Sequence, residues 1–147
     1  MAHNFIQHPD FKTQNINTPS LFLTSSLALL PPGLDPQKAM NIILRPQRDL
    51  DIKGASLLQQ KVFSLFPAPP HSNWAIDLVQ VQNIDHFGLT TLVTIRQAAQ
   101  HYQCNLYLFN LKPSVRYMLA ITELESQFKV VDNLETLFTD GLRIVLC

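Results

Sequence analysis

The chain has 147 residues, 46% of them hydrophobic, which is enough for one compact domain and too few for two ordinary ones. Its 11 basic and 11 acidic residues cancel, so net charge favours neither nucleic acid nor an anionic membrane surface. Cys104 and Cys147 are far apart and belong to no CxxC or Cys/His spacing. We therefore expect no disulfide framework, no metal site and no cofactor, in a protein of the reducing cytoplasm.

The longest apolar stretch outside the expected core, Leu21 to Leu30, is too short for a bilayer, which needs about 20 helical residues. Residues 1–20 also lack the basic start and immediate apolar core of a secretory signal. We expect neither membrane insertion nor export.

Residues 1–39 are rich in Asn, Gln, Thr, Ser and Pro and end in a cluster of helix breakers around Pro31 and Gly33. They are predicted to be an extension of a domain that spans residues 40–147. Two interpretations stay open: a real tail that docks Leu21 to Leu30 onto the domain, or a mis-called start upstream of a natural Met40.

From Met40 onward the hydrophobic pattern alternates between the strand and the helix period. Residues 40–44 and 74–81 are predicted strands, Asp51 can cap a helix, and a second helix is expected from about residue 89 to 102. The first helix has its apolar positions at Leu57, Leu58, Val62, Leu65 and Phe66. The remaining expected elements are a strand at 105–109, a helix from Pro113 with Val115 and Leu119 buried, a strand at 128–131, a short helix at 133–138 and a strand or apolar tail at 142–146. This alternation predicts an α/β fold with a mainly parallel sheet of about four to five strands and helices packed against it.

The run Trp74 to Val81, followed by Ile84-Asp85-His86-Phe87-Gly88-Leu89-Thr90-Thr91-Leu92, resembles the signature of the STAS family, in which an apolar strand leads to Asp-Ser-Ser-Gly-Leu at a helix start. Further landmarks occur in the family's order. They are Leu50-Asp51 followed by Ala55, Leu108-Phe109-Asn110, and the expected helix from Val115 to Leu124. The resemblance covers residues 40–138 and implies a STAS-like fold and an anti-sigma factor antagonist type of function in transcription regulation.

In that family, a partner kinase that doubles as an anti-sigma factor phosphorylates the first serine of the motif and thereby breaks the complex. Here the phosphoacceptor position is His86 and the next residue is Phe87, so both hydroxyls of the motif are lost. Arg48 and Glu123 also replace glycines that the family often has. The resemblance implies a partner-binding surface at Asp51, Asp85, His86, Phe87, Gly88, Leu89, Thr90 and Thr91, without the serine switch.

The individual residues of this surface allow several roles. His86 could be a contact residue, a pH sensor or itself a phosphoacceptor, and Phe87 could be exposed or buried. Asp85 and Asp51 are expected to cap helices rather than to bind a ligand independently.

Thr90 or Thr91 could replace the missing hydroxyl, although ordinary helix positions also explain them. Asp77, within an apolar strand, needs hydrogen-bond donors and is expected to bond to a neighbouring loop.

An enzyme is not expected, because the sequence contains no nucleophile elbow, phosphate loop, dinucleotide fingerprint or zinc-protease motif. The preferred function is a non-catalytic module that docks a kinase-like anti-sigma regulator or another STAS-binding protein. The alternatives are a structural STAS subunit of an ABC-type lipid transport complex and a small-ligand sensor.

Overall fold

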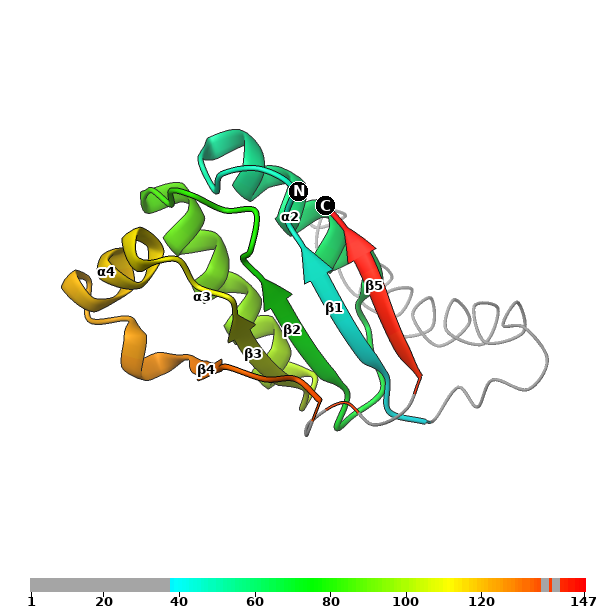
Figure 1. Ribbon diagram of the computed structural model, residues 1–147. Coiled ribbons are helices and arrows are strands. Elements are labelled where there is room, and N and C mark those ends of the chain that lie inside the picture. Colours follow the sequence, from blue (N-terminus) through cyan, green and yellow to red (C-terminus); the bar gives the residue numbers. More distant parts are fainter. Residues whose placement is uncertain (1–37, 136–137, 139–140) are drawn as a thin grey trace, which may run out of the picture. The chain divides into compact units, whose positions relative to one another are not determined.

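The computed structural model describes residues 38–135, 138 and 141–147 (Figure 1). Five parallel strands form one sheet in the order β4-β3-β2-β1-β5. The elements are β1 (Asn41–Arg45), α2 (Ile52–Leu65), β2 (Asn73–Asp77), α3 (His86–His101), β3 (Asn105–Phe109), α4 (Pro113–Ile121), the 3-10 helix η1 (Glu125–Gln127), β4 (Lys129–Val131) and β5 (Leu142–Leu146). The predicted α/β class with a mainly parallel sheet of four to five strands is confirmed.

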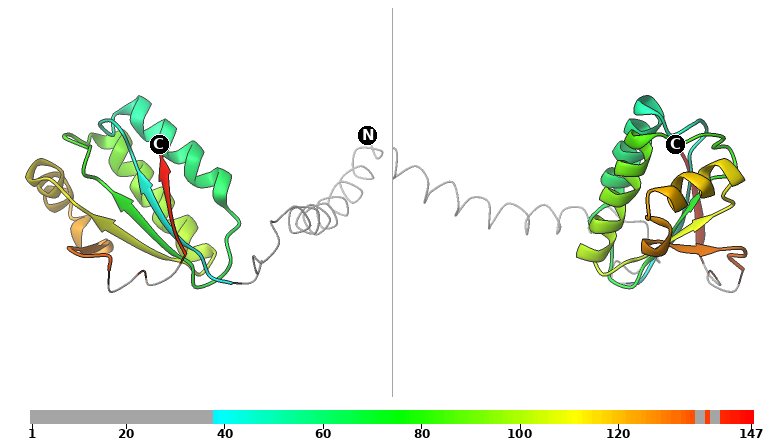
Figure 2. Two further views of the ribbon diagram at one scale, coloured as in Figure 1. Left: turned by 45° about the vertical axis from the view of Figure 1, so that its right-hand side comes forward. Right: turned by 90° about the vertical axis from the view of Figure 1, so that its left-hand side faces the viewer.

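The main core lies between the sheet and its helices. Figures 1 and 2 show α2 and α3 side by side on one face of the sheet. Fully buried side chains from strands and helices meet there, among them Ile42, Leu44, Trp74, Ile76, Leu58, Val62, Leu92, Ile95, Leu108 and Leu119. Burial of this apolar surface is the main free-energy term that holds the helices on the sheet.

The opposite face of the sheet carries a smaller apolar cluster. Ile43 and Ala75 are buried there against Leu134 and Phe138, which follow β4. Since successive residues of a strand point to opposite faces, β1 and β2 are apolar on both sides, as buried parallel strands usually are.

The first three strands share a register set by a spacing of 32 residues. Asn41, Asn73 and Asn105 start β1, β2 and β3, and their side chains form a ladder across the sheet. Asn73 Nδ2 donates to Asn41 Oδ1 and Asn105 Nδ2 to Asn73 Oδ1, each at 3.0 Å. The ladder aligns the starts of the three parallel strands. Because each strand has five residues, the loops that follow the strands also emerge at one edge of the sheet.

Several predicted boundaries were wrong. The second strand ends at Asp77 rather than residue 81, because Asp77 Oδ1 accepts from Val79 N and Val81 N donates back to Leu78 O, which makes a turn. α3 begins at His86 rather than near residue 89. Of the apolar positions expected in the first helix, Leu58 and Val62 are buried, whereas Leu57 is 42% exposed.

The C-terminal apolar tail is resolved as a strand, β5, which pairs with β1 at the edge of the sheet. The short helix expected at 133–138 falls partly on residues outside the described part, as do all but the last two residues of the expected extension 1–39. The interpretations of that extension therefore stay predictions.

Asp77 is buried and has the hydrogen-bond donors that its position demands. Arg45 Nε donates to Oδ2 at 2.8 Å, and Asn110 Nδ2 and Val79 N donate to Oδ1 at 3.0 and 3.1 Å. The predicted bond to a neighbouring loop is confirmed, and the arginine of β1 is added to it. The network ties the ends of β1, β2 and β3 together.

Candidate functional site

The start of α3 is fixed by its N-cap, Asp85. Its Oδ1 accepts from Phe87 N at 2.9 Å and from Gly88 N at 3.2 Å. Two of the backbone N–H groups that a helix leaves free at its N-terminus are thereby satisfied. The predicted capping role of Asp85 is confirmed, and the cap explains why the helix starts earlier than the apolar pattern suggested.

Gly88 sits where the helix meets the loop after β1. A Cβ atom at this position would lie 2.3 Å from Leu50 O and 2.5 Å from Ile84 Cγ1. Leu50 and Ile84 form an isolated parallel bridge in which Leu50 N donates to Asn83 O and Asp85 N donates to Leu50 O. Only glycine lets α3 approach this bridge so closely.

Asp49 joins the same two loops from the side. Its Oδ1 accepts from Gln82 N at 2.8 Å and from Asn83 N at 3.1 Å. Partial burial raises the pKa of the Asp49 carboxyl, but these hydrogen bonds and the nearby Arg48 outweigh it and leave the pKa below its usual value. Sequence analysis did not single out Asp49, because an aspartate in a polar loop carries no signal of its own.

Asp51 caps α2 as predicted. Its Oδ1 accepts from Gly54 N at 2.9 Å, and Arg48 lies 3.9 Å from its other oxygen. The bond from Gly54 N and the Arg48 charge hold the pKa of Asp51 below its usual value. Both helices at the site therefore begin at a carboxylate that is already engaged with backbone donors.

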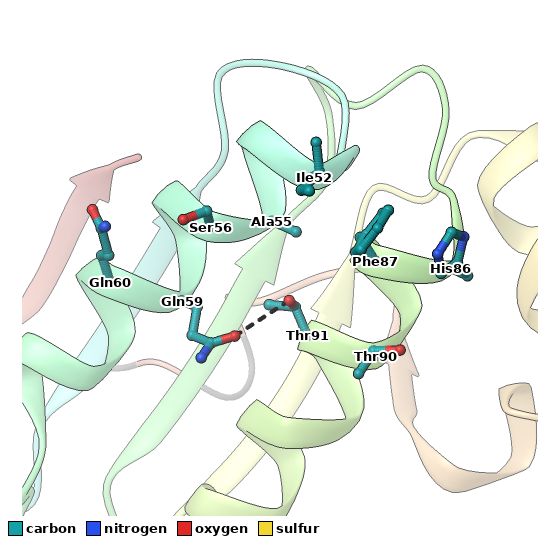
Figure 3. Close-up of a pocket in the computed structure, with 9 residues that line it drawn as sticks. All are labelled: Ile52, Ala55, Ser56, Gln59, Gln60, His86, Phe87, Thr90 and Thr91. Carbon is teal, nitrogen blue, oxygen red and sulfur yellow. Dashed lines mark hydrogen bonds between the residues drawn. The ribbon is translucent and has the colours of Figure 1, made fainter.

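His86 and Phe87 present two rings at the first turn of α3. Their centroids are 4.1 Å apart at an angle of 36°. Phe87 is 41% exposed and His86 is also exposed, so the alternative in which Phe87 is buried is wrong. Figure 3 shows Phe87 beside Ile52 of α2, with His86 farther from α2.

A groove of about 630 Å³ runs between α2 and α3 next to these rings (Figure 3). Thr91 Oγ1 and Gln59 Oε1 meet across it at 3.5 Å. The lining residues are Ile52, Ala55, Ser56, Gln59, Gln60, His86, Phe87, Thr90 and Thr91. Sequence analysis missed the contribution of α2, because the pattern shows which face of a helix is exposed but not which helix lies beside it.

Comparison with known proteins identifies the family to which this domain belongs. The family described as "STAS domain" matches residues 34–137. This chain belongs to the STAS domain family. A candidate anti-sigma factor antagonist from Thermotoga neapolitana is 28% identical over 93 residues, which cover 63% of this chain and 82% of the relative. Its counterpart from Thermotoga maritima is 27% identical over the same shares.

Solved structures agree on the fold of this STAS domain. The crystal structure of the candidate anti-sigma factor antagonist from Thermotoga maritima superposes with a TM-score of 0.56 at 25% identity, covering 65% of this chain and 82% of that one. A sulfate transporter family protein from Wolinella succinogenes gives a TM-score of 0.51 at 14% identity, with 75% and 87% covered. The second likeness concerns the fold alone.

The STAS domain brings most of the predicted site residues to one corner. His86, Phe87 and Thr90 are exposed there, and Asp85 is half-buried. Gly88, Leu89 and Thr91 are buried, so they shape the helix start and the groove floor more than they offer contact surface. Only some residues of the predicted surface are therefore exposed. The groove beside them is also lined by residues of α2, which the motif does not include.

Within the described ranges, no three or more His, Cys, Asp or Glu side chains gather as a metal site would require. Both cysteines are free thiols, and burial raises the pKa of each. None of the helices among the described residues has the length and apolar character to cross a membrane.

Proposed function

We propose that this STAS domain is a non-catalytic interaction module of the cytoplasm that docks a protein regulator, of the kinase or anti-sigma type, through the start of α3. The observation that carries the proposal is the exposed ring of Phe87 beside the groove. An exposed aromatic ring with a polar rim is a common anchor in protein interfaces. The names of the two Thermotoga relatives support this class of partner.

We further propose that serine phosphorylation does not switch this surface. Neither His86 nor Phe87 carries a hydroxyl. A phosphoryl group would bring about −1.5 to −2 charges next to Asp85, whose carboxylate already occupies the Phe87 and Gly88 N–H groups. Without that event, binding through this corner is constitutive.

A structural role in a larger assembly, such as an ABC-type lipid transport complex, is a second candidate. It is favoured by the edge strand β5, in which Leu142, Ile144 and Leu146 are about half exposed. In such an assembly the contact would be at β5, whereas in the first proposal it is at α3. The two candidates therefore predict different cross-linking positions.

The test places a photo-reactive phenylalanine analogue at position 87, at 144, or at the exposed Tyr117 of α4 as a control. The labelled proteins are irradiated in a lysate of the source organism, and products are identified by mass spectrometry. We expect a specific product from position 87. A label at position 90 should capture the same protein in the otherwise unchanged domain, but not in the double variant His86→Glu, Phe87→Ala. Specific products from position 144 alone would favour the structural role and contradict the first proposal.

The absence of a serine switch is tested separately. The captured partner, if it hydrolyses or binds ATP, is incubated with the purified domain and ATP, and phosphopeptides are mapped. No phosphate is expected on residues 85–91. Stoichiometric phosphate on Thr90 or Thr91 would show that a threonine has taken over the role of the lost serine.

A further inference from the structure

The sheet face opposite α2 and α3 carries exposed apolar side chains at β5. Ile43 of β1 is buried on this face in the cluster around Phe138. Ile144 is the register partner of Ile43 in β5 and points to the same face, but it is about half exposed. Leu142 and Leu146, on the same side of the strand, are also about half exposed. The apolar surface of this face is thus covered at β1 and uncovered at β5.

β5 also has a free edge. It is the last strand in the order β4-β3-β2-β1-β5, and among the described residues it pairs with β1 alone (Figure 1). A free edge of apolar residues is a template for pairing with another segment, which proteins usually block with proline or charge. β5 has no proline, and its one charged residue, Arg143, points to the opposite face. A segment that covers β5 would therefore bury both its edge and its apolar face.

The leading part of the chain joins the domain next to this strand. Met40 N donates to Ser72 Oγ at 2.9 Å, and Met40 O accepts from Asn73 N at 2.8 Å. The following residue, Asn41, is the register partner of Leu142 at the start of β5. Figure 1 shows β1 and β5 beginning at the same end of the sheet. The leading part of the chain is thus attached at a fixed point beside β5.

The leading part contains an apolar run that is long enough for β5. Residues 21–30 include five leucines and a phenylalanine and no charged residue. The eleven residues from Leu30 to Asn41 can span up to roughly 36 Å. A strand of five residues is only about 16 Å long, so the run can reach every position of β5.

The size of the uncovered surface favours the chain's own segment over a second copy. Stable interfaces between separate proteins bury about 800 Å² on each partner. A five-residue strand with three half-exposed side chains is too small to supply that area by itself. A tethered segment needs less area, because a short linker holds it at an effective concentration in the millimolar range.

We infer that residues 21–30 of the same chain dock on β5 and cover Leu142, Ile144 and Leu146. The contact lies away from the start of α3, so it does not rest on docking of a regulator there. It does bear on the second candidate function, because an assembly partner at β5 would have to displace this segment.

The inference is tested by placing a photo-reactive phenylalanine analogue at position 144 of the purified whole chain. An equal mixture of isotope-labelled and unlabelled copies is irradiated and digested with trypsin, which cuts after Lys12 and Lys38 and releases the peptide 13–38. We expect position 144 to be joined to this peptide with both halves from the same copy, and the analogue at the exposed Tyr117 to give no such product. A product that combines the two isotopes would show a second copy on β5 and overturn the inference, as would a yield no higher than that of the Tyr117 control.

A second measurement leaves Ile144 in place. Hydrogen exchange of residues 142–146 is compared between the wild type and the double variant Leu27→Asp, Leu29→Asp. We expect exchange to become faster by at least about tenfold, because two apolar contacts of the segment are lost. The matched control, Gln14→Asp with Asn15→Asp, adds the same charge outside the apolar run and should exchange like the wild type.

Exchange in α3 should be the same in all three proteins, which verifies that the domain stays folded. Unchanged exchange at β5 in the leucine variant would overturn the inference. It would leave docking at α3 untouched, because that proposal is tested from position 87.

Discussion

Replacing Gly88 by alanine is the sharpest probe of how the site is built. The new Cβ atom would lie 2.3 Å from Leu50 O, 2.5 Å from Ile84 Cγ1 and 2.7 Å from Leu50 Cβ. Leu50 is fully buried and Ile84 is 5% exposed, so neither can swing into solvent. One of the contacts is to a backbone oxygen, and relief therefore requires α3 or the Leu50–Ile84 bridge to move.

The expected cost follows from three contributions. Overpacking a filled interior costs about 1–3 kcal/mol. Displacing Leu50 O weakens its hydrogen bond from Asp85 N, which is worth about 1 kcal/mol. Alanine is a better helix former than glycine and returns at most about 1 kcal/mol. The net loss of unfolding free energy is about 1–3 kcal/mol, or a fall in melting temperature of about 4–8 °C for each kcal/mol in a domain near 100 residues.

The assay is urea unfolding followed by tryptophan fluorescence, since Trp74 is buried in the core. The matched control is Gln97→Ala, an exposed position on the same helix, which should change the unfolding free energy by less than about 0.5 kcal/mol. A Gly88→Ala protein as stable as the wild type would refute the close approach of α3 to Leu50.

Three further predictions concern the carboxylates. Asp85→Ala should lower the unfolding free energy by about 1 kcal/mol while Asp85→Ser retains most of it, because serine can also accept from the helix start; equal losses would contradict the cap. Asp77→Ala leaves the Arg45 guanidinium without its partner and should cost about 2–4 kcal/mol, whereas adding Arg45→Met should cost little more, a non-additivity that a double-mutant cycle measures. Folding lowers the pKa values of Asp49 and Asp51 below their usual 3.8, so their contribution to stability is complete above about pH 4 and is lost as pH falls through the folded-state values. Urea titrations at pH 7 and pH 3 should therefore show lower stability in acid, and Asp49→Asn should reduce the difference.

The features that sequence analysis predicted well are those decided by neighbouring residues. The alternation of strand and helix patterns gave the α/β class, and the caps at Asp51 and Asp85 depend on a side chain reaching backbone groups two or three positions ahead. The bond from Asp77 was also predictable, because a carboxylate among apolar strand residues must find donors. Each of these arguments needs only a short window of sequence.

The features that it missed depend on pairs of distant segments. The pattern of α2 shows an exposed face but not that this face borders α3, so Gln59 and Ser56 were not assigned to the site. The place of β5 beside β1 could not be fixed either, because residues 142–146 are apolar enough for a strand or a packed tail. Gly88 was recognised as part of a motif, but its close approach to Leu50 appears only in three dimensions.

The cap at Asp85 determines which groups of a partner the start of α3 can bind. At an open helix N-terminus, free N–H groups and the helix dipole attract anions. Here the Phe87 and Gly88 N–H groups both donate to Asp85 Oδ1, and Leu89 N donates to Asp85 O. An anionic group on a partner therefore finds few free donors at this corner, whereas an apolar group finds the Phe87 ring.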